Sequence, residues 1–285
     1  MTGPDHAIAA PALPLRPFVS HYAGSRVRDV PQWQHAGLPS RYIDLIVSLA
    51  RPIEIVRMPG AQSPGAYRAF VAGLQQAPAV VRMGGELDCL HVFLKPAAAG
   101  ALLGVSGREV ASHVVHLADV DGALCNELVE RLSSAGTWPE RFAAVDRVFL
   151  QRLRPVTMPD AMAWTWRRLA ITHGRAPVHE LAREIGFSRR HFGERFIAEF
   201  GVAPKAAARI FRFEHACRLF LRSPVASSTS RSPAASTTRP TWCTNGMRWR
   251  AARRGNGSSA SSRFYKTMKS AAAMIDACES SPASV

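Results

Sequence analysis

The stretch that most constrains the fold of this chain is VHELAREIGFSRRHFGERFIAEF, residues 178–200. Its apolar residues recur at helical spacing in two short runs. The first run contains Leu181, Ala182 and Ile185, and the second contains Phe192, Phe196 and Phe200. Between the runs, Gly186 is free to take the positive φ of a tight turn, and Ser188 is a suitable N-cap. Because the small Ala182 stands where the two helices would cross, the spacing predicts a helix-turn-helix.

The second helix of this pair would carry polar residues opposite its Phe face. In a helix-turn-helix, the N-terminal part of that helix enters the DNA major groove. Arg190 suits paired hydrogen bonds to guanine O6 and N7, and Glu194 can accept a hydrogen bond from cytosine N4. Ser188 and Arg189, at the helix start, suit phosphate contacts. Gly193 lies on the same face, and the alternative for each arginine is an ordinary solvated helix charge.

The net charge of +15 is unevenly placed along the chain. Residues 1–160 contain 15 Lys and Arg against 14 Asp and Glu, whereas residues 161–285 contain 21 against 7. A neutral half followed by a strongly basic half indicates that only the second half meets a polyanion such as double-stranded DNA. The alternative is a basic tail that is merely solvated.

Other features of the composition bear on location and cofactors. No run approaches the roughly 18 apolar residues of a membrane span. The N-terminus, MTGPDHAIAAPALPLRP, has no basic residue before its apolar part, which is unlike a secretory signal. An odd number of widely spaced cysteines favours reduced thiols over a disulfide framework or a zinc site. We therefore expect a cytoplasmic protein without membrane contact, metal or other cofactor. The cysteines are Cys89, Cys125, Cys217, Cys243 and Cys278.

Residues 40–96 contain short β-branched runs separated by Pro, Gly, Ser and Gln. These runs predict an antiparallel sheet curled into a small barrel or sandwich, with Gly84-Gly85 as a turn between strands. After Pro96 the apolar spacing becomes helical, and Thr137 followed by Glu140 is typical of a helix start. The predicted fold class is therefore α+β. The strand-like runs are RYIDLIVSL, PIEIVRM, RAFVAGL, AVVRM and CLHVFLKP.

No catalytic constellation is predicted in the neutral half. His113 and His116 could share a helix face as metal ligands, but no third ligand has a motif-like spacing. A triad of Ser106, His91 and Asp88 exists only on paper, because no nucleophile elbow accompanies it. We expect a protein that is not an enzyme.

A third segment with helical spacing begins at Pro204 and continues as KAAARIFRFEHACRLFL. Together, LAREIGFSRRHFGERF and GVAPKAAARIFRFEHACRL resemble the first half of the DNA-binding domain of the AraC/XylS family of bacterial transcription regulators. The match covers about residues 161–222. Members carry two helix-turn-helix units joined by a linker helix that begins near a Pro-Lys pair, which implies Lys205 as a further DNA-binding candidate.

The neutral half has a looser resemblance to the same family. PLRPFVSHY, AFVAGL and FLKPAAAGALLGVSGREV resemble the N-terminal domain of an AraC-like subgroup. This implies that residues 1–155 sense a small-molecule effector, bind a ligand or dimerise. It also implies an all-α helix-turn-helix domain at residues 160–222, a promoter or operator as partner, and RNA polymerase and a second copy of the chain as further candidate partners.

The tail departs from the family pattern. The family places a second helix-turn-helix at about residues 225–265, but residues 223–285 show no apolar period and are rich in Ser and Arg. A segment with so little apolar surface cannot fold independently, which predicts a disordered tail.

The genetic code points to an origin for this tail. Residues 239–251 read RPTWCTNGMRWRA, and moving the frame one base earlier forces valine at the junction of Trp242 and Cys243. The shifted frame can read DIAxACGFYDQAHLVHEWDALAG, which has the Ala-to-Gly spacing of the missing motif. We therefore predict a frameshift between about Ser223 and Ser228, arising as a mutation or as a sequencing error.

The sequence thus predicts a sequence-specific DNA-binding transcription regulator of AraC type. Its recognition helix spans about residues 188–200, and its specificity is impaired by loss of the second motif. The alternatives are a small-molecule-processing enzyme, a thiol-dependent DNA-repair protein that carries an AraC-like module, and a non-functional truncated product.

Overall fold

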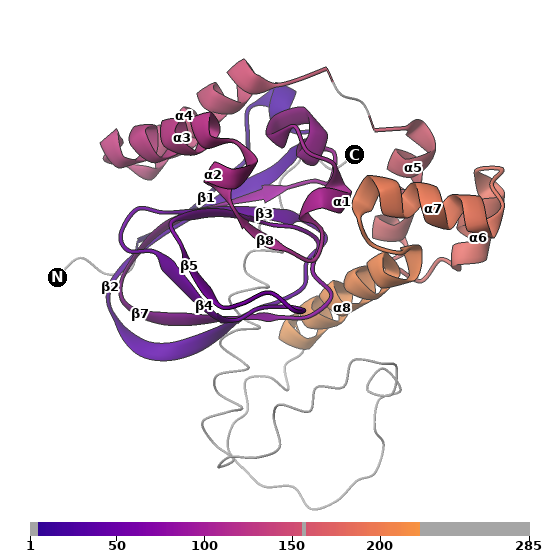
Figure 1. Cartoon of the computed structure of the whole chain (residues 1–285), viewed down its shortest axis with the longest axis horizontal. Coiled ribbons are helices and arrows are strands. Elements are labelled where there is room, and N and C mark those ends of the chain that lie inside the picture. Colours follow the sequence, from indigo (N-terminus) through magenta and orange to yellow (C-terminus); the bar gives the residue numbers. More distant parts are fainter. Residues whose placement is uncertain (1–4, 156–157, 223–285) are drawn as a thin grey trace, which may run out of the picture.

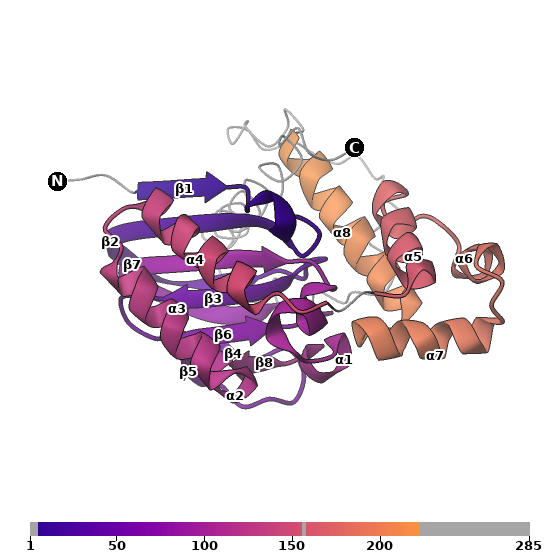
Figure 2. The same ribbon diagram turned by 90° about the horizontal axis from the view of Figure 1, so that it is seen from above.

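The computed structural model describes residues 5–155 and 158–222. Residues 5–155, here called the sheet domain, form a sheet with helices on one side (Figure 1). Residues 158–222, here called the helical unit, contain helices only and lie beside one end of the sheet (Figure 2). The predicted α+β class is confirmed in this coarse form. The tail at residues 223–285, with its predicted disorder and frameshift, lies outside the described residues.

Eight strands form one antiparallel sheet. Its main path runs β1-β2-β7-β3-β6-β8, and β4 pairs with both β7 and β5. Along the described chain, the two ends of this path do not pair with each other, so a closed barrel is not among the pairings. The strands are β1 (Asp5–Ala9), β2 (Val19–Gly37), β3 (Ile43–Ser48), β4 (Ile53–Arg57), β5 (Gly65–Tyr67), β6 (Ala69–Ala72), β7 (Ala79–Leu94) and β8 (Val114–His116).

The long strands β2 and β7 organise the sheet, because they pair along almost their whole lengths. Their register slips near Val30, which pairs with Gly85. Gly84 and Gly85 have φ values of 152° and 71°, which other residues rarely adopt. The prediction of a turn at Gly84-Gly85 is therefore wrong, since these glycines lie inside β7 at a bulge. Strands β1 and β2 were not predicted, because the bulged and polar second half of β2 lacks a regular alternation.

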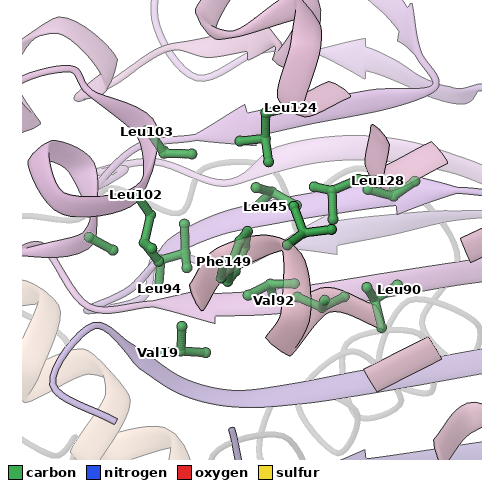
Figure 3. Packing of buried hydrophobic residues seen from close by; sticks show 14 of the residues in the cluster. Val19, Leu45, Leu90, Val92, Leu94, Leu102, Leu103, Leu124, Leu128 and Phe149 are labelled. Carbon is green, nitrogen blue, oxygen red and sulfur yellow. The ribbon is translucent and has the colours of Figure 1, made fainter. Parts of the chain in front are cut away.

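Helices α3 and α4 cover one face of the sheet (Figure 2). Alternate residues of β3 and β7 point towards them and form the main core, which Figure 3 shows around Phe149. The helical elements of the sheet domain are η1 (Leu13–Leu15), η2 (Ala99–Leu103), α1 (Gly107–Val110), α2 (Leu117–Val120), α3 (Gly122–Ser134) and α4 (Trp138–Arg152).

The start of α4 confirms the predicted cap. Thr137 accepts a hydrogen bond from the backbone N–H of Glu140, and the Glu140 side chain accepts one from the backbone N–H of Thr137. This reciprocal capping box satisfies two backbone donors that the first helical turn leaves without partners.

A buried ion pair fixes α4 on the sheet. Arg141 donates two hydrogen bonds to Asp88 of β7, at 2.6 and 3.2 Å. Arg26 of β2 donates a third to the same carboxylate at 3.0 Å. The Arg141 guanidinium also lies 4.8 Å from the centre of the Trp138 ring. Asp88 is therefore a structural residue that joins two strands to a helix.

The helical unit has a core of its own that two residues of the sheet domain complete. Phe192, Phe196 and Phe200 are at most 1% exposed and form its centre. The ring of Trp166 stacks on Phe200 at 4.5 Å. From the sheet domain, Leu74 and Ala111 join the same cluster. The helices are α5 (Asp160–Ile171), α6 (Val178–Glu184), α7 (Arg189–Phe200) and α8 (Pro204–Arg222).

Candidate nucleic-acid interface

The turn between α6 and α7 follows from one glycine. Gly186 has φ of 73° and donates its N–H to the carbonyl of Arg183 at 3.1 Å. Phe187 donates to the carbonyl of Ala182 at 2.9 Å. These bonds satisfy carbonyls at the end of α6 and reverse the chain direction, as a C-terminal glycine does. Ala182, only 1% exposed, supplies the small buried surface that the sequence required.

Helix α7 then starts at a side-chain cap. The hydroxyl of Ser188 accepts a hydrogen bond from the backbone N–H of His191 at 3.2 Å. The helix ends at Gly201, whose φ of 70° suits a C-terminal cap. Since the three phenylalanines of α7 face the core, the opposite face of the helix is left to solvent. Helices α6 and α7 are thus joined by a tight turn, and their identity as a DNA-binding helix-turn-helix stays a prediction.

The sequence-predicted residues of α7 share this open face. Ser188, Arg189, Arg190 and Glu194 are exposed. The side chains of Arg190 and Glu194 are 90% and 61% exposed, and they form an ion pair one turn apart at 2.9 Å. A pair so exposed contributes only about 0.2–0.5 kcal/mol to folding. Both side chains are therefore available to a ligand at small cost.

The described contacts do not explain why residue 193 is a glycine. It lies inside α7, where glycine costs about 0.5–1 kcal/mol relative to alanine. A Cβ built at this position meets nothing within 4 Å. The missing side chain instead leaves the backbone of α7 open to close approach from outside, between Arg190 and Glu194.

Two further basic residues of the helical unit are exposed on the neighbouring helices. Lys205 is exposed in the first turn of α8. Arg183 is exposed in the last turn of α6 and was not predicted. The first helix of a helix-turn-helix crosses the DNA backbone, which is the signal that would have identified it. Over residues 158–222 the unit carries 12 Lys and Arg against 6 Asp and Glu.

Ser106, His91 and Asp88 do not form a catalytic triad in the structure. The hydroxyl of Ser106 caps α1 by accepting from Glu109. His91 lies 3.0 Å from Asp44, and Asp88 binds two arginines. His113 and His116 do not share a helix face, because β8 replaces the expected helix at residues 114–116. Within residues 5–155 and 158–222, no cluster of His, Cys, Asp and Glu is arranged to hold a metal ion.

The thiols in the described chain are poor nucleophiles. Burial raises the pKa of Cys89 to about 12, and the negative charge of Asp88 adds to the rise. Burial likewise raises the pKa of Cys217 to about 12, with the charge of Glu214 adding to it, and burial raises the pKa of Cys125. Because the thiolate is the reactive form, these cysteines do not favour a thiol-dependent reaction. Cys243 and Cys278 lie outside the described residues.

No helix within residues 5–155 and 158–222 combines the length and the apolar composition needed to cross a lipid bilayer.

Comparison with known proteins gives limited matches. Residues 8–116 match a family described as a domain of unknown function, DUF6597. No curated protein sequence matches the chain. The chain is similar to ToxT from Vibrio cholerae O395, at 8% identity over 77% of this chain and 82% of ToxT, with a TM-score of 0.39.

Two further solved structures are similar at the same level. ToxT from Vibrio cholerae strain SCE256, bound to an unsaturated fatty acid, has 7% identity over 79% of this chain and 84% of that one, with a TM-score of 0.37. The AraC-like transcriptional activator CuxR has 16% identity over 75% and 86%, with a TM-score of 0.26. Because these TM-scores lie below 0.5, the likenesses assign neither a fold nor a function to this chain.

Proposed function

We propose that this protein is a DNA-binding transcription regulator of AraC type, with α7 as its recognition helix. The observation that carries the proposal is the exposed face of α7, which presents Arg190, Gly193 and Glu194 on a helix held from behind by three buried phenylalanines. An α-helix fits the major groove of B-DNA, and this face combines a donor, an acceptor and an open backbone.

Each residue of the face has a separate role in the proposed complex. Arg190 donates paired hydrogen bonds to a guanine, and Glu194 accepts from a cytosine N4. Ser188 and Arg189, at the N-terminus of α7, contact phosphate, where the helix dipole and charge both favour an anion. Lys205 contacts the backbone from the start of α8. The ion pair between Arg190 and Glu194 opens as the two side chains turn to the bases.

The test is a selection of duplexes from a random pool by the full chain, followed by titrations at several salt concentrations. We expect enrichment of a short motif, as one recognition helix reads about 3–4 base positions. Lys205→Ala should weaken binding to all sequences alike and reduce the salt slope by about 1. Arg28→Ala, which removes an equal charge from an exposed site on β2, is the control. A pool that remains random, with no salt-dependent binding, would overturn the proposal.

We propose that this chain has lost the second helix-turn-helix, with its recognition helix, through the frameshift between about Ser223 and Ser228. An intact member would place two recognition helices in successive major grooves, roughly 34 Å apart. With one helix, specific binding falls towards non-specific binding, because half of the base contacts are missing. Nanomolar binding of this chain to one operator at physiological salt would contradict this expectation.

Sequencing fresh genomic DNA across the codons for residues 223–240 tests the frameshift directly. A base missing from the present sequence means that the natural protein has a second recognition helix. The corrected chain should then select a longer motif than the present one. An unchanged sequence, together with equal motifs for the present and the frame-corrected chains, would show that the shifted frame encodes no second recognition helix.

We propose that residues 1–155 act as the sensory or dimerising part of the regulator, with a small-molecule effector of unassigned chemistry. In the described chain, no arrangement of nucleophile, base and orienting group favours the enzyme alternative. The protein is therefore proposed to act in the cytoplasm on promoter or operator DNA, with RNA polymerase and a second copy as further partners.

A further inference from the structure

Among the described residues, the contacts between the sheet domain and the helical unit include the following three. At the first, Arg41, just before β3, contacts α8. At the second, Gln76 accepts a hydrogen bond from Arg209 of α8 at 2.9 Å, near Leu74. At the third, α1 lies against the C-terminal end of α7. All three contacts come from loops or short helices at one end of the sheet.

The Arg41 contact is the buried one. Its backbone N–H donates to the Glu214 carboxylate at 2.6 Å, and its guanidinium forms an ion pair with the same carboxylate. Glu214 is 1% exposed and Arg41 14%. The guanidinium also lies 4.8 Å from the centre of the buried Phe211 ring. Glu214 belongs to the helical unit, and two hydrogen bonds to its side chain come from Arg41 of the sheet domain.

The contact with Arg41 stabilises the negative charge of the buried Glu214 carboxylate. Burial raises the pKa of its carboxyl group, whereas the charges of Arg41 and Arg218 and the hydrogen bonds from Arg41 lower it. A buried carboxylate without its partner carries an uncompensated desolvation cost. Arg218 of the helical unit supplies part of this compensation, and Arg41 of the sheet domain supplies the remainder together with two hydrogen bonds.

The third contact depends on close backbone approach. A Cβ on Gly107 would overlap the carbonyl oxygen of Glu199, and a Cβ on Gly201 would overlap the side chain of Ala111. Two glycines, one on each side, thus let α1 and the end of α7 meet at backbone distance. Such a contact tolerates little sliding between the two parts.

We propose that Arg41 is a positioning residue that latches α8 to the sheet domain, so that the sheet domain sets the direction in which α7 presents its open face. The role of this contact in DNA binding rests on the proposed function, whereas the contact between Arg41 and Glu214 exists in the protein without DNA. The three contacts leave the face of Arg190 and Glu194 uncovered, because α1 reaches only the opposite, C-terminal end of α7. The contact of Arg41 with α8 therefore orients α7 without covering its open face.

The test is hydrogen exchange of the full chain, compared between wild type, Arg41→Gln and the double variant Arg41→Gln/Glu214→Gln. In Arg41→Gln we expect at least tenfold faster exchange in residues 209–218 and also in residues 107–112, which Arg41 does not touch. Residues 122–152 of α3 and α4 should exchange as in wild type. The double variant should lie between the two, since it removes both charges of the Arg41–Glu214 pair and two amides can still bond.

Arg28→Gln is the matched control, because it removes an exposed arginine from the same domain. Wild-type exchange at residues 107–112 in folded Arg41→Gln would overturn the latch. If Arg41→Gln fails to fold, Gln76→Ala with Arg209→Ala should give a smaller rise at residues 107–112, and no rise there would equally overturn it.

DNA titrations separate this inference from the proposed function. Arg41→Gln should keep the salt slope of the wild type, because Arg41 does not belong to the open face of α7. A chain that shows the exchange changes but binds no DNA would retain the latch and refute the regulator. A changed salt slope in Arg41→Gln would place Arg41 at the DNA and refute its positioning role.

Discussion

Two arginine–carboxylate pairs in this molecule have the same chemistry and opposite surroundings. At the junction of α4 and β7, Arg141 and Asp88 are 5% and 14% exposed, and Arg26 adds a third donor. On α7, Arg190 and Glu194 are 90% and 61% exposed and pair with each other. The buried pair holds elements together, whereas the exposed pair can change partners at little cost.

The comparison teaches how to separate structural from functional arginines in a chain rich in them. A residue that is committed to folding should change stability when it is removed and leave ligand binding per folded molecule intact. A residue that waits for a ligand should do the reverse. The four predictions below apply this distinction, beginning with the largest expected effect.

Asp88→Ala should lower the free energy of unfolding by about 3–5 kcal/mol, because it leaves Arg141 buried without its partner. Urea unfolding followed by circular dichroism measures the loss. Arg147→Ala, on the exposed side of α4, should stay within about 0.5 kcal/mol of wild type. If the Asp88 variant were as stable as the Arg147 variant, the buried pair of Arg141 and Asp88 would not stabilise the fold.

Arg190→Ala should have the opposite profile. We expect a loss of about 1–3 kcal/mol of discrimination for the selected DNA over a duplex changed at one guanine. The same substitution should change the unfolding free energy by no more than about 0.5 kcal/mol. Fluorescence anisotropy and urea unfolding on one preparation measure both quantities. Equal loss for all duplexes would assign Arg190 to phosphate rather than to a base.

Gly193→Ala should raise the free energy of unfolding and lower the DNA affinity. Alanine improves helix propensity, and the new Cβ meets nothing, so unfolding free energy should rise by about 0.5–1 kcal/mol. DNA affinity should fall, since the methyl group would stand between α7 and the groove floor. Calorimetry and anisotropy test the pair of effects, and unchanged affinity would leave Gly193 outside the interface.

The smallest effect concerns an exposed carboxylate that is nonetheless structural. Hydrogen bonds from the backbone N–H groups of Thr137 and Gly136 hold the pKa of Glu140 below its usual range. A lowered folded-state pKa contributes stability above the unfolded pKa, and this contribution is lost as pH falls through the folded pKa.

Glu140→Gln should therefore be less stable than wild type at pH 7, and the difference should shrink towards pH 3. Thermal unfolding from pH 7 to pH 3 measures it. Glu130→Gln, at an exposed position of α3, is the control. A difference that stays constant with pH would show that the Glu140 charge does not support the cap.

Much of the helical part could be read from local signals. Gly186, Ser188 and the spacing of three phenylalanines predict the turn, the cap and the buried face of α7, because each acts through its own few neighbours. The cap at Thr137 was predictable for the same reason. The open face of α7 followed as the side opposite the phenylalanines, and the DNA role of its residues stays a prediction.

The sheet was harder to predict, because its pairing is long-range. Gly84 and Gly85 look locally like a turn, yet they form a bulge since the long strand β2 continues past them. The strand character of β2 depends on β7, to which it bonds, and its polar residues hide any alternation. His113 and His116 have a helical spacing, but pairing with β6 makes residues 114–116 a strand.

The sequence by itself determined the turn between α6 and α7, the caps that start α7 and α4, and the uneven charge, since propensity, capping and spacing act within a few residues. Only the tertiary structure decided that Asp88 binds Arg141, 53 positions away, and that Glu214 lies on Arg41, 173 positions away. Whether a charged side chain is structural or free depends on what surrounds it after folding. Burial, which local sequence does not encode, separates Arg141 and Arg41 from Arg190.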